Sequence, residues 1–309
     1  MMDLRGRDLV SMDDLTAEEL WAVLDFARDL KRRGERADRP QPLSGRTLAM
    51  IFEKPSLRTR VTFEVAMYQL GGTSIYLAPQ DAQLGTRETI PDAARNLERW
   101  VDAIVARTFA HSTVVQLAEH ARIPVINGLS DREHPCQTLA DLLTVYERFG
   151  GFRGITLAWV GDGNNVCHSL LLGAAKVGLN LRVATPPGHA PEPEIVQNAE
   201  RQAQTNGATI GQTIDPAEAV RGADVIYTDV WASMGQEQEH AQRVRLFRPY
   251  QVNAALLRQA RPEAVVLHCL PAHRGEEIAD EVLDGPQAIV FDQAENRLHA
   301  QKALLAMIL

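Results

Sequence analysis

The sequence predicts an α/β protein of two doubly wound domains, each with a mainly parallel sheet flanked by helices. Short apolar runs alternate with stretches of helical periodicity along the whole chain, which favours right-handed βαβ crossovers. The length of 309 residues is enough for two hydrophobic cores. Polar clusters follow several of the apolar runs, and ligands bind at the carboxyl ends of parallel strands.

The buried strands are predicted from short apolar runs, which fall in both halves of the chain. These runs are Thr47–Phe52, Asp102–Arg107, Pro124–Asn127, Ile155–Val160, Leu181–Thr185, Asp224–Thr228, Ala264–His268 and Ala288–Phe291. Between them, apolar residues at helical spacing predict helices, for example over Leu139–Arg148 and Ser169–Lys176. We see no internal repeat and no low-complexity tract.

A turn at Phe149-Gly150-Gly151-Phe152 separates a long predicted helix from a new strand, and it marks the expected domain boundary. The first domain is therefore expected over residues 1–148 and the second over residues 149–294. The last segment, Glu295 to Leu309, has helical periodicity and follows the last predicted strand. We expect it to pack back on the first domain.

Composition and charge exclude several classes of protein. Lys and Arg number 32 against 40 Asp and Glu, a net charge of −8 that does not favour nucleic acid or anionic membranes as partners. No apolar stretch is long enough to span a bilayer, and the first ten residues carry charges where a signal peptide would be apolar. The odd number of cysteines, three, argues against a disulfide framework. A cytoplasmic protein is expected.

The first polar cluster is Ser56-Leu57-Arg58-Thr59-Arg60, between the first predicted strand and a helix that ends at Gly71-Gly72. Ser56 is a candidate N-cap, and the paired glycines are a candidate C-terminal stop. Backbone N–H groups at a helix N-terminus, with hydroxyls and guanidinium groups beside them, can bind phosphate. The alternative is that Ser56 only caps the helix and the arginines are solvated; local physics leaves both interpretations open.

The run Gly161-Asp162-Gly163-Asn164-Asn165 follows another predicted strand and invites comparison with a dinucleotide-binding loop. The pattern Gly-x-Gly-x-x-Gly fails, because its sixth position is Val166. No acid closes the strand Leu181–Thr185, where a ribose would be bound. A nicotinamide-dependent enzyme is therefore the weaker interpretation.

Four motifs together resemble the aspartate and ornithine carbamoyltransferase family. They are Ser-x-Arg-Thr-Arg at Ser56–Arg60, His134-Pro135-Cys136-Gln137, Asp229-Val230-Trp231-Ala232-Ser233-Met234-Gly235 and His268-Cys269-Leu270-Pro271. Segments around Gln83, Asn165 and Arg297 are similar as well, so the resemblance extends from about Leu43 to the last residue. The chain departs from the family at Leu57, where Thr is common.

The resemblance implies an active site in the cleft between the domains, with roles for particular residues. Arg107, His134, Asp229 and Cys269 would be catalytic. Carbamoyl phosphate would be bound by Ser56, Leu57, Arg58, Thr59, Gln83, Arg107, His134, Gln137, Cys269, Leu270 and Arg297. Ornithine would be bound by Asn165, Asp229, Ser233 and Met234.

The implied reaction moves the carbamoyl group of carbamoyl phosphate to the δ-amine of ornithine, without a metal or an organic cofactor. The Ser-Met-Gly segment favours ornithine over aspartate and acetylornithine, and putrescine would leave Asn165 and Asp229 unused. The resemblance also implies a homotrimer or a multiple of trimers. We expect a place in arginine metabolism, in the biosynthetic direction. A catalytically silent protein on the same fold is the remaining alternative.

Overall fold

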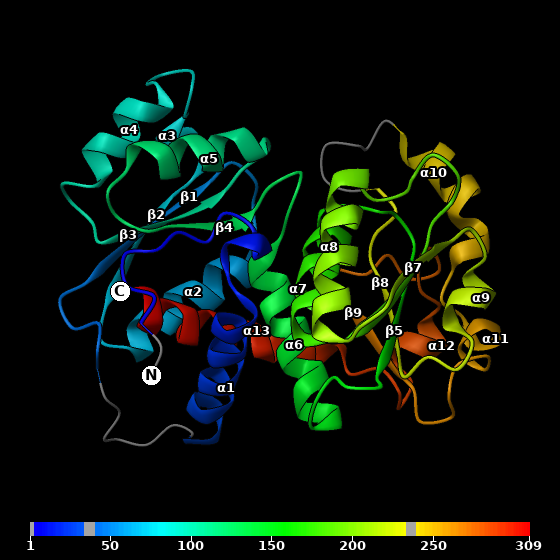
Figure 1. Cartoon of the computed structure of the whole chain (residues 1–309). Coiled ribbons are helices and arrows are strands. Elements are labelled where there is room, and N and C mark those ends of the chain that lie inside the picture. Colours follow the sequence, from blue (N-terminus) through cyan, green and yellow to red (C-terminus); the bar gives the residue numbers. More distant parts are fainter. Residues whose placement is uncertain (1–2, 34–40, 233–238) are drawn as a thin grey trace. The chain divides into compact units, whose positions relative to one another are not determined.

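The computed structural model describes residues 3–33, 41–232 and 239–309 (Figure 1). The chain divides into two compact units, each of which is described by itself. Unit 1 comprises Met1–Leu143 and Glu295–Leu309, and unit 2 comprises Thr144–Ala294. The division falls within helix α6 (Pro135–Phe149) rather than at the glycine turn that follows it. In the described part of the chain no helix combines the length and the apolar character needed to cross a membrane.

Unit 1 contains a parallel sheet in the order β2-β1-β3-β4. Its strands are β1 (Thr47–Phe52), β2 (Thr73–Leu77), β3 (Ala103–Arg107) and β4 (Val125–Leu129). Its helical segments are η1 (Met12–Asp14), α1 (Ala17–Arg33), α2 (Leu57–Gln69), α3 (Pro79–Ala82), α4 (Ile90–Leu97), α5 (His111–His120), most of α6 and most of α13 (Val290–Ile308). Helices α4 and α5 cover one face of this sheet, and α2 and α13 cover the other (Figure 1).

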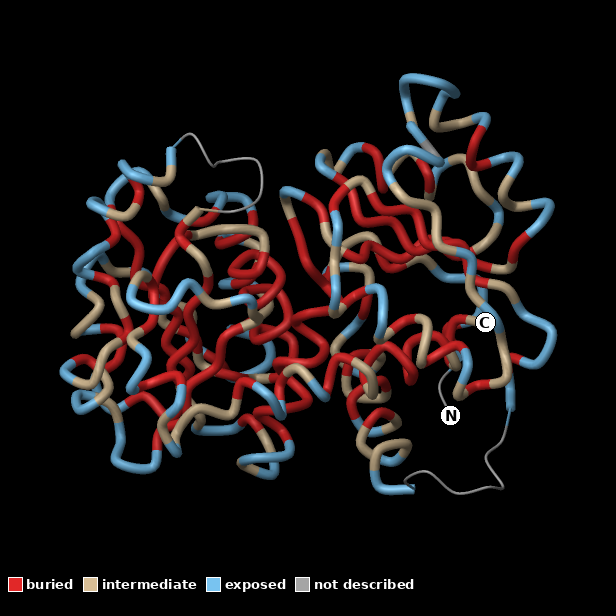
Figure 2. Tube along the Cα trace, turned by 180° about the vertical axis from the view of Figure 1, so that it is seen from behind, coloured by how far each residue is buried: buried red, intermediate tan, exposed pale blue. Residues whose placement is uncertain are grey.

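Unit 2 contains a second parallel sheet in the order β7-β6-β5-β8-β9. Its strands are β5 (Thr156–Val160), β6 (Asn180–Ala184), β7 (Ile210–Thr213), β8 (Val225–Thr228) and β9 (Val265–His268). Its helical segments are α7 (Asn165–Val177), α8 (Pro193–Asn206), α9 (Pro216–Val220), α10 (His240–Phe247), η3 (Arg248–Tyr250), α11 (Ala254–Leu257) and α12 (Asp280–Leu283). The central strands of both sheets are buried (Figure 2), and helices flank them, so the predicted fold class is confirmed.

Three strand predictions need correction. The predicted strand Ala288–Phe291 is wrong, because only an isolated bridge joins Ala288 to Val266 and helix α13 begins at Val290. Val290 and Phe291, at the end of the apolar run, belong to the first turn of this helix, where Val290 is buried and Phe291 is exposed. Strands β2 and β7 were not predicted. Both are edge strands with partly exposed, polar positions, so neither contains a continuous apolar run.

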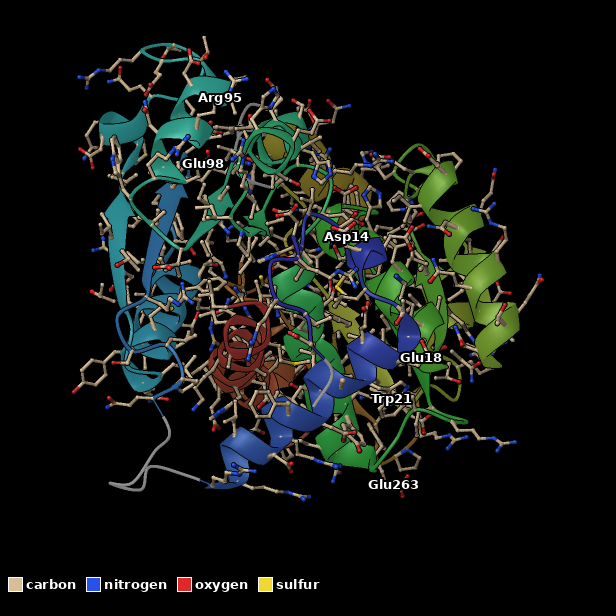
Figure 3. All side chains as sticks on the ribbon, turned by 60° about the vertical axis from the view of Figure 1, so that its left-hand side comes forward. Asp14, Glu18, Trp21, Arg95, Glu98 and Glu263 are labelled. Carbon is tan, nitrogen blue, oxygen red and sulfur yellow. The ribbon has the colours of Figure 1, made fainter. Side chains whose placement is uncertain are left out.

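The N-terminal segment covers the outer edge of β4. The N–H of Leu9 donates to the Val125 carbonyl at 2.9 Å, and the N–H of Asn127 donates to the Leu9 carbonyl at 2.8 Å. The Asp14 carboxylate, labelled in Figure 3, accepts from the N–H groups of Val10 and Ser11 and fixes the turn that leads into α1. This extra pairing satisfies backbone groups that an open sheet edge would leave exposed.

Gly163 lies where two backbone segments approach closely. Its N–H donates to the His189 carbonyl at 2.9 Å. A Cβ atom on Gly163 would lie 2.3 Å from the backbone nitrogen of Pro191 and 2.6 Å from the carbonyl carbon of Ala190. Only glycine fits this turn between β5 and α7 without a backbone shift.

We predict that Gly163→Ala lowers the free energy of unfolding by about 1–3 kcal/mol, because backbone atoms must move to accept the new methyl group. Denaturant unfolding measures the change. Gly211→Ala in strand β7 is the matched control, since a Cβ there meets no atom within 4 Å. The control should stay within about 0.5 kcal/mol of the unsubstituted protein. Equal stability of both variants would contradict the steric argument.

Candidate active site

Helix α2 begins at the carboxyl end of β1, as the Ser-x-Arg-Thr-Arg motif predicted. The Ser56 hydroxyl caps it by accepting from the Thr59 N–H at 3.2 Å, and Gly71, with φ of 86°, follows the C-cap residue Leu70. Both predicted ends of the helix are therefore confirmed. The Leu57 side chain is 74% exposed, so its hydrocarbon adds nothing to this turn beyond the backbone.

Arg297 joins three segments of unit 1 that are far apart in the sequence. Its buried guanidinium, on α13, donates to Oε1 of Gln137 at 2.6 Å and to Oγ1 of Thr59 at 3.1 Å. Nε2 of Gln137 donates in turn to the carboxylate of Asp141 at 2.8 Å, one turn further along α6. Asp141 was not singled out in the sequence, yet it orients the Gln137 amide so that its oxygen meets the arginine.

His134 lies beside these residues in a strongly positive environment. Burial lowers the pKa of the imidazole well below 6.5, and the charges of Arg297, Arg107 and Arg58 lower it further. The imidazole is therefore neutral at physiological pH. Three guanidinium groups that act on one buried ring form a site of positive potential, which suits a phosphate dianion.

A hydrogen-bonded turn positions His134 near these arginines. The N–H of Ser130 donates to the Glu133 carbonyl at 2.9 Å, and the Ser130 hydroxyl accepts from the N–H of Glu133 at 3.2 Å. The Glu133 carboxylate accepts from the Met12 N–H at 2.9 Å, which ties the turn to the N-terminal segment. Immediately afterwards, α6 starts at Pro135, a residue well suited to the first position of a helix.

Arg107 ends strand β3, where its side chain is buried. The adjoining edge of the sheet is held by Glu53, whose N–H donates to the Arg107 carbonyl at 2.8 Å and whose carboxylate accepts from the Phe109 N–H at 2.6 Å. The Lys54 ammonium lies 4.5 Å from the centre of the Phe109 ring. Glu53 and Lys54 lie just before the Ser-x-Arg-Thr-Arg motif, separated from it by Pro55, and this proximity is the signal that could have drawn attention to them.

Gln83 is not brought to this cluster. It lies at the end of α3 in a left-handed conformation, with φ of 44°, and its side chain is exposed. Its amide donates to the Gln80 carbonyl at 3.3 Å. Among the residues described, no contact joins it to Arg107 or His134.

In unit 2, the Asp229 carboxylate is the common acceptor for three groups. It is buried just after β8. Its Oδ1 accepts from the Cys269 thiol at 2.9 Å and from the Val230 N–H at 2.8 Å, and its Oδ2 accepts from Nδ2 of Asn164 at 2.8 Å. The structure thus brings together Asp229 and Cys269 from two different strand ends, as predicted.

Asn164 was missed, because the resemblance pointed to its neighbour. Its Oδ1 caps α7 by accepting from the N–H groups of Val166 and Cys167, while Asn165 is the first residue of that helix. These amides are the groups with which a dinucleotide-binding loop would hold a pyrophosphate. The side chain of Asn164 already occupies them, which argues against the nicotinamide interpretation.

A buried pair, His268 and Glu277, holds the loop that carries Cys269 and Leu270. Nδ1 of His268 accepts from the Leu270 N–H at 2.9 Å, and Nε2 lies 3.0 Å from the Glu277 carboxylate. The same carboxylate oxygen accepts from the N–H of His273 at 2.6 Å. Because Nδ1 accepts, the proton is assigned to Nε2. Leu270 has φ of 58° and precedes a cis peptide bond to Pro271.

The other two cysteines have structural environments. Burial raises the pKa of Cys136 to about 12, and its thiol donates to the Asn127 carbonyl at 3.4 Å. Burial also raises the pKa of Cys167 well above 9.0. Both therefore remain thiols, so neither serves as a nucleophile at neutral pH.

Two predicted residues, Ser233 and Met234, lie outside the described residues.

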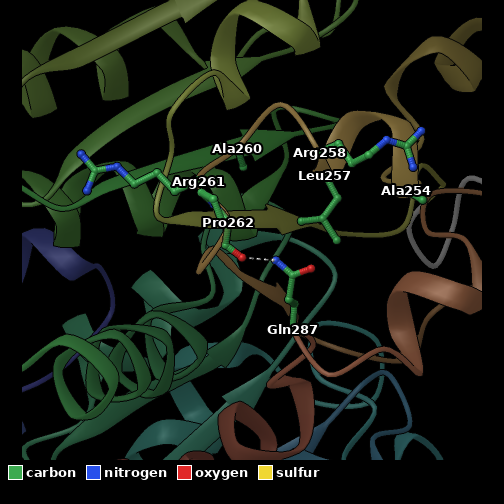
Figure 4. Close-up of a pocket in the computed structure, with 7 residues that line it drawn as sticks. All are labelled: Ala254, Leu257, Arg258, Ala260, Arg261, Pro262 and Gln287. Atoms are coloured by element: carbon green, nitrogen blue, oxygen red, sulfur yellow. Dashed lines mark hydrogen bonds between the residues drawn. The ribbon is translucent and has the colours of Figure 1, made fainter.

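A surface pocket of unit 2 (Figure 4) is lined by Ala254, Leu257, Arg258, Ala260, Arg261, Pro262 and Gln287. Within the pocket, the Gln287 amide donates a hydrogen bond to the Pro262 carbonyl at 3.3 Å, drawn as a dashed line. None of the predicted site residues lines this pocket, so it belongs to another part of the surface.

Comparison with known proteins gives matches over nearly the whole chain. Residues 7–147 match the family described as "Aspartate/ornithine carbamoyltransferase, carbamoyl-P binding domain", and residues 153–308 match "Aspartate/ornithine carbamoyltransferase, Asp/Orn binding domain". The ornithine carbamoyltransferase of Carboxydothermus hydrogenoformans is 56% identical over 99% of this chain and 98% of its own. The solved ornithine carbamoyltransferase of Pyrococcus furiosus has a TM-score of 0.97 at 52% identity, covering 100% of this chain and 98% of that one. The chain belongs to the aspartate/ornithine carbamoyltransferase family.

Proposed function

We propose that this chain is an ornithine carbamoyltransferase, which makes citrulline and phosphate from ornithine and carbamoyl phosphate. The observation that carries the proposal is the set of three arginines around one buried, neutral histidine in unit 1. The relatives at 52–56% identity, named ornithine carbamoyltransferase, narrow the accepting amine to ornithine.

Carbamoyl phosphate binds first to unit 1 in this proposal. The N-terminal end of α2, where helix geometry favours an anion, and the guanidinium groups of Arg58 and Arg107 balance the charge of the phosphate. Leu57 contributes its N–H and no hydroxyl. Ser56 and Thr59 offer hydroxyls, and Gln83 would add its amide from a neighbouring subunit.

The carbamoyl group is held by His134, Gln137 and Arg297. A neutral imidazole still has one N–H to donate to the carbonyl oxygen, where negative charge grows as the amine attacks. The Gln137 oxygen keeps a second lone pair beside its bond from Arg297, and this lone pair can accept from the carbamoyl NH₂. Arg297 orients the Gln137 amide and adds positive charge to the site.

Ornithine is bound by unit 2. Asp229 takes the α-ammonium, Asn165 takes the α-carboxylate, and Ser233 with Met234 covers the ligand. Cys269 and the backbone at Leu270 lie beside the δ-amine, whose pKa in water is about 10.4. A poorly hydrated pocket favours its neutral form. The nitrogen then forms a bond to the carbamoyl carbon, the bond from that carbon to the phosphate oxygen breaks, and the departing phosphate takes the proton.

The two domains share these tasks in the proposal. Residues 1–148 with the C-terminal helix bind carbamoyl phosphate, and residues 149–294 bind ornithine. We propose a homotrimeric unit, a cytoplasmic location and the biosynthetic direction. The relative from Pyrococcus furiosus, 52% identical over 100% of this chain, is named anabolic, which supports the direction.

Turnover with a panel of amines tests the proposed reaction. L-ornithine, N-acetylornithine, putrescine and L-aspartate are offered with carbamoyl phosphate, and each carbamoylated product is quantified. We expect citrulline to form with a clear preference for L-ornithine. A preference for another amine would overturn the roles of Asn165, Asp229 and Cys269, and no turnover with any amine would favour a silent protein.

Arg58→Ala should reduce kcat/KM for carbamoyl phosphate by about 10²–10³-fold, because a charge-assisted contact to the phosphate is lost. Arg60→Ala is the matched control. The Arg60 guanidinium lies 3.8 Å from the centre of the Tyr76 ring, and its Nε donates to Glu64 at 3.0 Å. Losing this exposed pair should change kcat/KM by less than about threefold. Equal effects of the two substitutions would refute the assignment of Arg58.

His134→Gln should make the protein less sensitive to acid. The folded-state pKa of His134 lies well below 6.5, so as pH falls through about 6.5 the unfolded chain takes up a proton that the folded chain does not. Between pH 7 and pH 5 the unsubstituted protein should lose up to about 2 kcal/mol of unfolding free energy that the variant keeps. Urea unfolding at both pH values measures the difference. An identical pH dependence would mean that folding does not lower the pKa of His134, which would contradict the prediction.

A further inference from the structure

Two imidazoles and one carboxylate converge on the surface of unit 2. His240 is the first residue of α10, and His273 and Glu276 lie in the loop between β9 and α12. Nε2 of His240 lies 3.1 Å from Oε2 of Glu276, and Nδ1 of His273 lies 3.7 Å from the same oxygen. All three ligand atoms lie within 4.8 Å of one another.

The two nitrogen–oxygen separations are close to the distance between two ligand atoms of a tetrahedral metal site, and the shorter one is a hydrogen bond that a bound ion would replace. Zinc binds imidazole nitrogen and carboxylate oxygen at about 2.0–2.2 Å, which puts two ligand atoms of a tetrahedron about 3.3–3.6 Å apart. The distances of 3.1 and 3.7 Å fall on either side of this value. The side chains of His240, His273 and Glu276 are 42%, 44% and 29% exposed, so an ion can reach them and water can fill the fourth position.

The loop that carries two of these ligands is rigidly built. The N–H of Glu276 donates to the His273 carbonyl at 2.9 Å, which closes a turn. The Gln251 amide donates to the carbonyls of Gly275 and Glu276 at 2.9 and 2.8 Å. The His273 N–H is held by Glu277. Binding an ion would therefore require little rearrangement of this loop.

We propose that His240, His273 and Glu276 form a site for a divalent transition-metal ion of the zinc type. The ion would link the start of α10 to the loop that follows β9. The site takes no part in the proposed carbamoyl transfer, and it stands independently of that proposal. The donor set of two imidazole nitrogens and one carboxylate oxygen suits zinc rather than magnesium or calcium.

A second group of possible ligands competes with this assignment. Asp229, His268 and Cys269 also present ligand atoms within 4.8 Å of one another. However, both ring nitrogens of His268 are engaged, one with the Leu270 N–H and one with Glu277, and its side chain is 0% exposed. An ion there would have to displace a fully buried hydrogen bond, whereas at the exposed cluster it would displace only the part-buried contact between His240 and Glu276, which favours the exposed cluster.

Binding of Co²⁺ and Zn²⁺ to the metal-free full chain tests the proposal. Isothermal titration with Zn²⁺ gives the stoichiometry and Kd, and the visible spectrum of the Co²⁺ form reports its ligands. The variants are His240→Ala, His273→Ala and Glu276→Gln, the last of which keeps the size of the side chain. His120→Ala, at the end of α5 in unit 1, is the control, because Nδ1 of His120 contacts the Gln116 carbonyl of its own helix, away from the proposed cluster.

We expect one ion per chain, a Kd raised at least about tenfold by each of the three substitutions, and no change in His120→Ala. Zn²⁺ should also raise the Tm of the unsubstituted protein and not that of His240→Ala. Absence of stoichiometric binding would overturn the proposal. So would unchanged Kd in all three variants, or a thiolate-to-cobalt band that disappears in Cys269→Ser. Far-UV circular dichroism of the metal-free variants verifies that they are folded.

Discussion

The contact on which unit 1 depends is the buried guanidinium of Arg297 between Gln137 and Thr59. A buried cation must be hydrogen-bonded, since an isolated charge in a protein interior costs several kcal/mol. The two acceptors come from α6 and α2, so the demand of one side chain for partners fixes three helices against one another. The same arginine contributes to the low pKa of His134. Packing and electrostatics at this site therefore have a common origin.

Unit 2 also contains a buried charged group with hydrogen-bond partners from distant segments, but here the charge is negative. The Asp229 carboxylate collects a thiol, a side-chain amide and a backbone N–H, which together compensate for its burial. Two of these donors, Asn164 and Cys269, follow β5 and β9, which lie on either side of β8 in the sheet. Parallel strands deliver their carboxyl ends to one edge, so residues 65 and 40 positions apart in the sequence reach the same carboxylate. The buried pair His268–Glu277 then fixes the loop on which Cys269 lies.

Local signals in the sequence predicted local structure well. The cap of α2 by Ser56 follows from the preference of serine for that position, and the central strands follow from continuous apolar runs. The edge strands β2 and β7 were not predicted, because their partly exposed positions include polar residues that interrupt such runs. The run at Ala288–Phe291 was misassigned because four apolar residues fit a strand or the start of a helix equally well.

In the candidate site, too, local sequence patterns did not reveal the contacts that depend on the tertiary fold. Its residues were selected by resemblance, since no spacing rule connects Arg297 to Thr59 across 238 positions. Asp141, Asn164 and Glu277, which orient other side chains, were invisible for the same reason: their partners are chosen by the folded backbone. The pair His240 and Glu276, 36 positions apart, likewise has no ligand spacing that a sequence pattern could report.

The place of Arg297 in the chain also has a consequence for biosynthesis. Ribosomes add residues from the N-terminus onward, so the strands and helices around Thr59 and Gln137 are made long before α13. Until that helix emerges, a nascent unit 1 has no guanidinium between these two side chains. The whole of unit 2 is translated in the interval. The proposed anion site is thus completed late during translation, and a chain stalled before α13 would hold an unfinished unit 1 whose exposed apolar surface is a target for chaperones.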